Sequence, residues 1–162
     1  MIPSQDNMSI RPANEADYAK LQELFQENDR HHARLLPGEF RASAAPRPRR
    51  LILEWLRDAR VLLLVCQREG GIVGCLRATL EQPPAAPAAK PQRFLKVQEL
   101  IVARRLRNAG IGSALMAEAE TWARRKRARR VRLEVLAKNH EAVSFCDELG
   151  FETLSASLEK RI

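Results

Sequence analysis

The chain has 162 residues, of which 45% are hydrophobic, so it is long enough to bury the core of one domain. It contains no run of 18 apolar residues and no basic-then-apolar leader, which excludes a membrane-spanning helix and disfavours export. The net charge of +8 comes mainly from arginine, but an aromatic content of only 5%, without interleaved basic and aromatic residues, disfavours a nucleic-acid-binding protein.

The first half of the chain combines helical and strand patterns. Asn14 and Asp17 have the spacing of a capping box, and apolar residues follow them at helical spacing. Further on, two β-rich runs flank Gly70 and Gly71, as in a hairpin. The elements predicted here are a strand over 8–11, a helix from Asn14 to about Asn28, a linker over 44–50, a helix over 51–58 and hairpin strands over 61–67 and 72–80.

The second half begins with a proline-rich stretch. Four prolines exclude a strand over 81–92, which is expected to form an extended loop. The basic run from Arg124 to Arg130 is interpreted as solvated cations that oppose the negative end of a helix dipole. The elements predicted here are strands over 94–102, 131–135 and 154–160, a helix from Ile111 to about Trp122 and a helix from Asn139 to Leu149.

The segment from Arg107 to Gly112 joins a predicted strand to a predicted helix, and we interpret it as a seat for a phosphate group. Gly110 and Gly112 lack Cβ atoms, so backbone N–H groups can approach a ligand closely. The unpaired N–H groups and the dipole at a helix start favour an anion, and Arg107 adds a positive charge at the rim. The alternative is a tight turn that binds nothing, because this turn lacks the full dinucleotide-binding and P-loop patterns.

The pattern Arg107-x-x-Gly110-x-Gly112 resembles the acyl-CoA pyrophosphate loop of the GNAT N-acetyltransferase superfamily, which reads R/Q-x-x-G-x-G/A. Two further segments resemble this family in the right order. Residues 131–135 are similar to its fifth strand, and the stretch from Asn139 to Phe151 is similar to its last helix and the exit from that helix. The resemblance therefore covers most of the chain.

This resemblance implies an α/β (α+β) fold in a single domain over residues 1–162, with a central mixed, mostly antiparallel sheet of six to seven strands and about four flanking helices. It implies acetyl-CoA as the cofactor and acetyl transfer to a primary amine by direct attack in a ternary complex. The fourth strand is expected to splay from the fifth and to free backbone amides for the cofactor. The implied cofactor-binding residues are Leu100, Ile101, Val102, Arg107, Asn108, Ala109, Gly110, Ile111, Gly112, Ser113 and Asn139.

Glu99 is the candidate general base of this site. Regular strand alternation places it on one face with Leu95, Val97 and Ile101, and desolvation there suits a carboxylate that accepts a proton. The family often has a glutamate at this place. The alternative is a structural ion pair, for instance with Arg77 on the neighbouring strand.

The chain departs from the family at the group that protonates the leaving thiolate. The family carries Phe-Tyr before its Leu-Gly-Phe exit, and here the pair is Phe145-Cys146. A thiol is able to donate a proton, so Cys146 is a catalytic candidate, with a far shorter side chain than a phenol. The alternative is packing, because Cys146 falls at the C3 position of a helix closed by Gly150, with Phe151 next as in a Schellman exit.

Other polar residues have less defined roles. His31 and His32 either contact the acceptor or are solvated at a helix end, which is the preferred interpretation. Glu134 is a second candidate base. The three cysteines, Cys66, Cys75 and Cys146, are odd in number and their spacing suits no zinc site, so we expect reduced thiols in a cytoplasm and no metal site.

Two further functions stay open beside the enzyme. Cys146 in the tyrosine position suggests a non-catalytic CoA-binding regulator, and the run from Arg124 to Arg132 suggests a basic nucleic-acid-binding module. The positive charge fits either a polyanion surface or a bias towards arginine and alanine together with attraction of the anionic cofactor. The sequence does not identify the acceptor, a small molecule or a peptide, and the resemblance favours a homodimer.

Overall fold

The computed structural model describes residues 7–43 and 47–162. Its sheet contains β1 (Met8–Pro12), β2 (Val61–Arg68), β3 (Gly71–Glu81), β4 (Phe94–Val102) and β5 (Val131–Leu133), which lie in this order across the sheet. Strands β1 to β4 are antiparallel, whereas β5 pairs with β4 in parallel. The predicted fold class is therefore confirmed, with five strands in the described residues where six to seven were expected.

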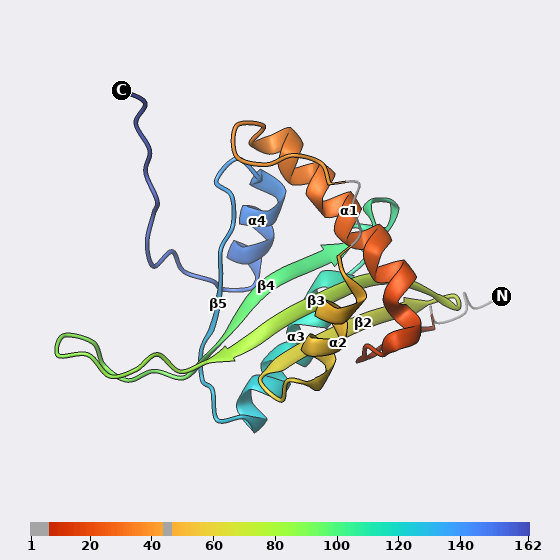
Figure 1. The fold of residues 1–162 in the computed structure, drawn as a ribbon, viewed down its shortest axis with the longest axis horizontal. Helices are drawn as coiled ribbons and strands as arrows, with labels where there is room; N and C mark the ends of the chain where they lie inside the picture. Colours follow the sequence, from red (N-terminus) through yellow and green to blue (C-terminus); the bar gives the residue numbers. More distant parts are fainter. Residues whose placement is uncertain (1–6, 44–46) are drawn as a thin grey trace.

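The described residues contain four α-helices, three of which lie against the sheet (Figure 1). They are α1 (Tyr18–Leu35), α2 (Arg49–Arg57), α3 (Ile111–Arg125) and α4 (His140–Glu148), and the short 3-10 helices η1 (Glu15–Asp17) and η2 (Arg104–Leu106) precede α1 and α3. Helices α1 and α2 share one face of the sheet and α3 lies on the other. None of the helices in the described ranges is long and apolar enough to cross a membrane.

The capping box at the start of η1 is confirmed. The Asn14 side chain accepts a hydrogen bond from the backbone N–H of Ala16, and the Asp17 side chain accepts one from the backbone N–H of Asn14 at 2.9 Å. Asp17 is buried and also pairs with Arg11 of β1, with nitrogen–oxygen distances of 2.8 and 2.9 Å. This contact ties the start of the helical layer to the first strand.

Two predicted helix boundaries were wrong. Helix α1 continues to Leu35 instead of ending near Asn28, so His31 and His32 lie inside a helix that stops just before Pro37. Helix α2 begins at Arg49, inside the predicted linker, and its buried residue is Ile52. Residues 44–46 of that linker lie outside the described residues.

The sheet separates two hydrophobic clusters. The α3 side is centred on buried residues such as Leu76, Leu95 and Leu115, and the α1/α2 side contains residues such as Leu21 and Ile101. Alternation along β2 explains this division, since its even-numbered residues from 62 to 66 belong to the first cluster and residues 63 and 65 to the second. The sheet is therefore buried on both faces, in keeping with its apolar strands.

Strand β4 departs from regular alternation. Arg77 of β3 pairs with Glu99, but the next residue, Ala78, pairs with Val97, so Gln98 is an extra residue at a β-bulge. The expectation that Leu95, Val97, Glu99 and Ile101 share one face was therefore wrong. The bulge leaves the first two on the α3 side and turns Glu99 and Ile101 towards α1 and α2.

Helix α4 ends as its sequence predicts. Gly150 has φ +82°, its backbone N–H bonds the carbonyl of Asp147, and the N–H of Phe151 bonds the carbonyl of Cys146. These two bonds form a Schellman motif. The strand predicted over 154–160 was wrong, because residues 151–162 form no strand and run outward as an extended tail (Figure 1). Strand β5 is also shorter than predicted and ends at Leu133.

Candidate active site

The turn between β4 and α3 has the backbone of an anion seat. Asn108 and Gly110 both have positive φ angles, of 61° and 79°, and α3 starts directly after Gly110. No side chain in residues 7–43 or 47–162 caps the start of α3, so the N–H groups of its first turn are available to a ligand. Together with the positive end of the helix dipole, these groups favour a phosphate.

The two glycines of this turn serve different purposes. A Cβ atom on Gly110 would meet no heavy atom within 4 Å, so this position needs glycine for its positive φ and leaves the space before α3 open. A Cβ atom on Gly112 would lie 3.2 Å from Cζ of Phe145. Gly112 is therefore the point where α4 packs against α3.

A gap opens between β4 and β5 beside this seat. Their pairing covers only residues 95–97 of β4 and 131–133 of β5, whereas β4 continues to Val102. From Gln98 onwards β4 pairs with no strand of the described residues on its β5 side, as the expected splaying requires. The backbone of Leu100, Ile101 and Val102 thus runs along the gap and leads to the seat.

Two polar side chains border the gap near the seat. The Arg107 guanidinium lies 3.5 Å from the carbonyl oxygen of Val102 and 3.5 Å from a carboxylate oxygen of Glu141 on α4. Asn139 caps α4 by accepting a hydrogen bond from the backbone N–H of Ala142 at 3.2 Å. Several residues predicted to hold a cofactor therefore lie where β4 parts from β5 and at the starts of α3 and α4.

The end of α1 also approaches Arg107 and Asn139, through His31. His31 is half-buried and belongs to the electrostatic surroundings of Arg107 and Asn139. Burial, followed by the charge of Arg107, lowers the pKa of His31, while a hydrogen bond with Asn139 opposes the shift. The neutral imidazole is thus favoured at neutral pH, and His31 is more enclosed than the preferred solvated interpretation supposed.

Glu99 faces the other side of β4, in a charged cluster. Its Oε2 accepts a hydrogen bond from Nε of Arg77 at 2.8 Å, and its Oε1 lies 3.6 Å from a guanidinium nitrogen of Arg47. The Glu99 side chain is only 12% exposed. The ion pair with Arg77, which the sequence left as an alternative, is therefore present, and charged rather than apolar side chains surround the carboxylate.

Arg47 was not anticipated as part of this site. Its backbone N–H bonds Gln22 at 2.6 Å and its carbonyl accepts the Tyr18 hydroxyl at 2.7 Å, so α1 holds it from both sides. Its guanidinium covers the ring of Phe25 and pairs with Asp29 at 3.0 Å. Neither periodicity nor a motif marks this residue in the sequence, because all these partners come from another element.

Cys146 and Glu134, the remaining candidates, lie in contrasting surroundings. Cys146 is 9% exposed, and burial raises the pKa of its thiol, which makes it a weaker acid. Its carbonyl forms the helix-ending bond described above, in keeping with packing. Glu134 is highly exposed and pairs with Lys96 at 3.2 Å.

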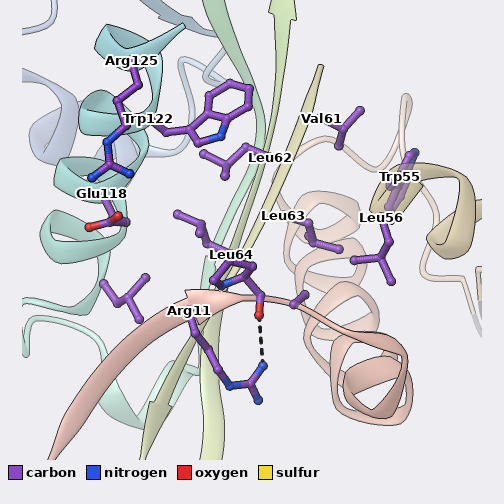
Figure 2. A pocket seen from close by; sticks show the side chains of 13 residues that line it. Arg11, Trp55, Leu56, Val61, Leu62, Leu63, Leu64, Glu118, Trp122 and Arg125 are labelled. Atoms are coloured by element: carbon purple, nitrogen blue, oxygen red, sulfur yellow. Dashed lines mark hydrogen bonds between the residues drawn. The ribbon is translucent and has the colours of Figure 1, made fainter. Parts of the chain in front are cut away.

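Two cavities lie away from the residues described so far. One, of about 380 Å³, opens where β1 ends, with Trp55 and Leu56 of α2 on one side and Glu118 and Trp122 of α3 on the other (Figure 2). The other, of about 270 Å³, adjoins α1 and the start of η2. Neither is lined by Glu99 or by residues 107–112. Among the described residues there is no group of three His, Cys, Asp or Glu side chains that could hold a metal ion.

Comparison with known families gives one match. The family model described as "Acetyltransferase (GNAT) family" matches residues 20–151, which include β4, the seat and α4. A comparison with curated proteins finds no match.

Solved structures share the fold at low sequence identity. A tetramutant of the BH1408 protein from Bacillus halodurans aligns at a TM-score of 0.90 with 19% identity, over 95% of this chain and 99% of that one. A transcriptional regulator from Bacillus halodurans C-125 aligns at 0.77 with 21% identity, over 96% and 100%. The aminoglycoside N-acetyltransferase AAC(6')-Iy, in complex with CoA, aligns at 0.73 with 18% identity, over 100% and 99%.

Proposed function

Because the chain belongs to the acetyltransferase (GNAT) family, we propose that it transfers the acetyl group of acetyl-CoA to a primary amine by direct attack in a ternary complex. One observation carries this proposal: the uncapped start of α3 lies at the end of a β4 strand that has already parted from β5. In this proposal the open edge of β4 holds the extended arm of the cofactor and leads to the phosphate seat. Bound acetyl-CoA supplies a thioester carbonyl whose acyl carbon an amine attacks, with release of coenzyme A as a thiol.

The seat at residues 107–113 and the open edge of β4 would have separate roles in cofactor binding. Residues 107–113 would hold the diphosphate through backbone N–H groups and the charge of Arg107. The backbone of Leu100, Ile101 and Val102 would bond the extended arm and polarise the carbonyl. Each preorganised N–H donor of this kind contributes roughly 3–4 kcal/mol in the transition state. Asn139, at the start of α4, would contact the cofactor from the other side of the gap between β4 and β5.

We assign the removal of the amine proton to Glu99. Arg77 holds Oε2 of this carboxylate at 2.8 Å, which fixes its orientation, whereas Oε1 has only the 3.6 Å contact with Arg47. Arg47 also has Asp29 as a nearer partner at 3.0 Å. An amine can therefore replace Arg47 at Oε1 without leaving that guanidinium unpaired. In this assignment Oε1 accepts the proton, and Arg77 is a positioning residue.

The departing thiolate requires a proton as well. Cys146 stays a candidate for this step, but a buried thiol with a raised pKa is a poor donor. Water that enters the gap between β4 and β5 is the simpler source. His31 is a further candidate for donating a proton to the thiolate, because it is half-buried and lies near Arg107 and Asn139.

The acceptor is an amine of a small molecule or a peptide. It would reach Glu99 from the side of α1 and α2, opposite to α3, because the bulge at Gln98 turns the carboxylate that way. Asp29 and Glu99 are the acids of this cluster and each already pairs with an arginine. This balance disfavours an acceptor with several positive charges.

A homodimer and a cytoplasmic location complete the proposal. The extended tail leaves Leu154 and Leu158 at 72% and 93% exposure, and a second copy is the simplest partner for them. Light scattering of the full chain and of a chain ending at Glu152 checks this, and a monomeric full chain would contradict it. The cysteines of the described residues are all unpaired, in keeping with a reducing compartment.

The alternative is a CoA-binding regulator without catalysis, favoured by Cys146 in place of tyrosine. Titration calorimetry with acetyl-CoA and a thiol-release assay with a panel of amines separate the two. Binding together with CoA release that depends on an amine supports the enzyme, and binding without release from any amine supports the regulator. A folded protein that does not bind acetyl-CoA at tens of micromolar would contradict both.

A further inference from the structure

The excess positive charge of this protein is concentrated in one short stretch. Residues 124–132, which we call the basic segment, contain six arginines, one lysine and no acidic residue. The net charge of the whole chain is +8, so the remaining residues are close to neutral. The segment comprises the last residues of α3, the turn after it and the start of β5.

The basic segment lies at the far end of α3 from the phosphate seat. Helix α3 has 15 residues and leads from the loop at one end of β4 to the opposite end of the sheet (Figure 1). At 1.5 Å per residue this is roughly 22 Å. The Debye length at physiological salt is about 8 Å, so charges at this distance contribute little to holding a diphosphate at the seat. Attraction of the cofactor therefore does not account for the segment.

Contacts inside the protein neutralise few of these cations. Arg124 pairs with Glu120, and Arg130 bonds the neutral amide of Gln92 at 3.2 Å. Arg127 and Arg129 are exposed, and their side chains have no hydrogen bond or ion pair with the described part of the chain. The helix dipole favours cations only within its last turn, and both of these residues lie beyond α3. The guanidinium groups of Arg127 and Arg129 thus face solvent without a neutralising partner among the described residues.

We propose that the basic segment is a second binding surface, separate from the acetyl-transfer site, for the phosphate backbone of double-stranded nucleic acid. Guanidinium groups donate paired hydrogen bonds that match phosphate oxygens, and a phosphodiester backbone presents anions at regular intervals. The large exposed hydrophobic residues of the described chain all lie outside the segment, so it lacks the apolar anchors of a membrane-surface element.

The segment also lacks a platform for stacking bases. The nearest indole, that of Trp122, is only partly exposed and has the Lys126 ammonium over its ring, 5.3 Å from the centroid. Binding would therefore be non-specific and electrostatic, directed at a duplex rather than at unpaired bases. The phosphate seat at the other end of α3 stays free when the segment is occupied.

Fluorescence anisotropy with a labelled random-sequence DNA duplex tests this proposal over a series of salt concentrations. The test variant is Arg127→Gln/Arg129→Gln/Arg130→Gln. The matched control removes the same charge from exposed arginines elsewhere, as Arg30→Gln/Arg41→Gln/Arg50→Gln. Each lost phosphate contact lowers the slope of log K against log salt by about 0.9, so the test variant should lose up to about 2.7 and the control almost nothing.

Other outcomes overturn the proposal. An equal loss in both variants would show that diffuse net charge binds the duplex, and no binding at low salt would remove the surface altogether. Tighter binding to phosphatidylserine vesicles than to the duplex would assign it to a membrane. Circular dichroism confirms that each variant is folded. Where the triple variant does not fold, Arg129→Gln alone replaces it, with an expected slope change of about 0.9.

Discussion

Replacement of Glu99 by glutamine separates its two roles, as a base and as an ion-pair partner. Glutamine keeps the shape of the side chain and still offers Arg77 an oxygen, but it cannot accept a proton. A positioned general base contributes about 10²–10⁴ in rate, or roughly 3–5 kcal/mol of the barrier. We therefore expect kcat of Glu99→Gln to fall by about that factor, while the affinity for acetyl-CoA changes little.

The cost in stability follows from the contacts. Breaking a fully buried ion pair costs about 3–5 kcal/mol, but Arg77 is 17% exposed and keeps its position over the Trp55 ring, while Arg47 keeps Asp29. We expect a loss of about 1–3 kcal/mol, and a fall in Tm of roughly 2–4 °C for each kcal/mol. Calorimetric melting and steady-state kinetics, both recorded well below the Tm, measure the two effects separately.

Arg77→Gln is the matched control. It breaks the same 2.8 Å ion pair and leaves the carboxylate in place. Because Arg77 positions the carboxylate, we expect Arg77→Gln to lose some kcat, but less than Glu99→Gln, and to lower the Tm at least as far, since it also gives up the contact with the Trp55 ring. If the kcat of Glu99→Gln stays within about threefold of the unmodified protein, or falls no further than that of Arg77→Gln, Glu99 is not the base.

Three further predictions concern the seat, the helix exit and the first cap. Arg107→Gln should weaken acetyl-CoA binding, measured by calorimetry, about 10- to 100-fold, because a hydrogen bond to a charged group is worth about 1.5–3 kcal/mol. An unchanged affinity would exclude Arg107 from the seat. Cys146→Ala should change kcat less than about threefold and lower the stability by about 1 kcal/mol in a denaturant titration, whereas a hundredfold loss of kcat would establish a proton donor. The pKa of Asp17 lies below its usual 3.8 because its carboxylate accepts hydrogen bonds from Arg11 and from the N–H of Asn14 and is attracted by the charge of Arg11. The contribution of Asp17 to the stability of the fold is therefore present above about pH 4 and is lost as the pH falls through the lower folded-state pKa. Asp17→Asn should therefore reduce stability at pH 7 and narrow the difference from the unmodified protein near pH 2, and a constant difference across this range in acid titrations would contradict the linkage.

Features that depend on a few consecutive residues could be predicted from the sequence. The capping box needs only Asn14 and Asp17, and the Schellman exit needs only Gly150 and the residues beside it. The turn before α3 belongs to this class as well, because Gly110 has a positive φ directly before the helix, whereas the anion seat at this turn stays a prediction. Each of these signals is a local preference of the backbone.

The surroundings of Glu99 could not be predicted in the same way. Strict alternation gave apolar neighbours, but one extra residue at Gln98 reversed the faces of β4, and such a bulge is set by the register against β3. Arg47 reaches Glu99 from another element altogether, through the loop after α1. The contact of Phe145 with Gly112 is equally long-range, so the sequence could not show that this glycine serves the packing of α4.

The sequence alone thus indicated the family and the order of most elements, because these follow from local backbone preferences and short motifs, and it predicts a phosphate seat from a motif of the same kind. Only the tertiary structure decided which groups face Glu99, that His31 lies near Arg107 and Asn139, and that the basic segment lies at the opposite end of α3 from Gly110. The physical reason is that burial, ion pairing and charge separation depend on distances between residues far apart in the chain, and those distances are fixed only when the sheet and its helices pack together.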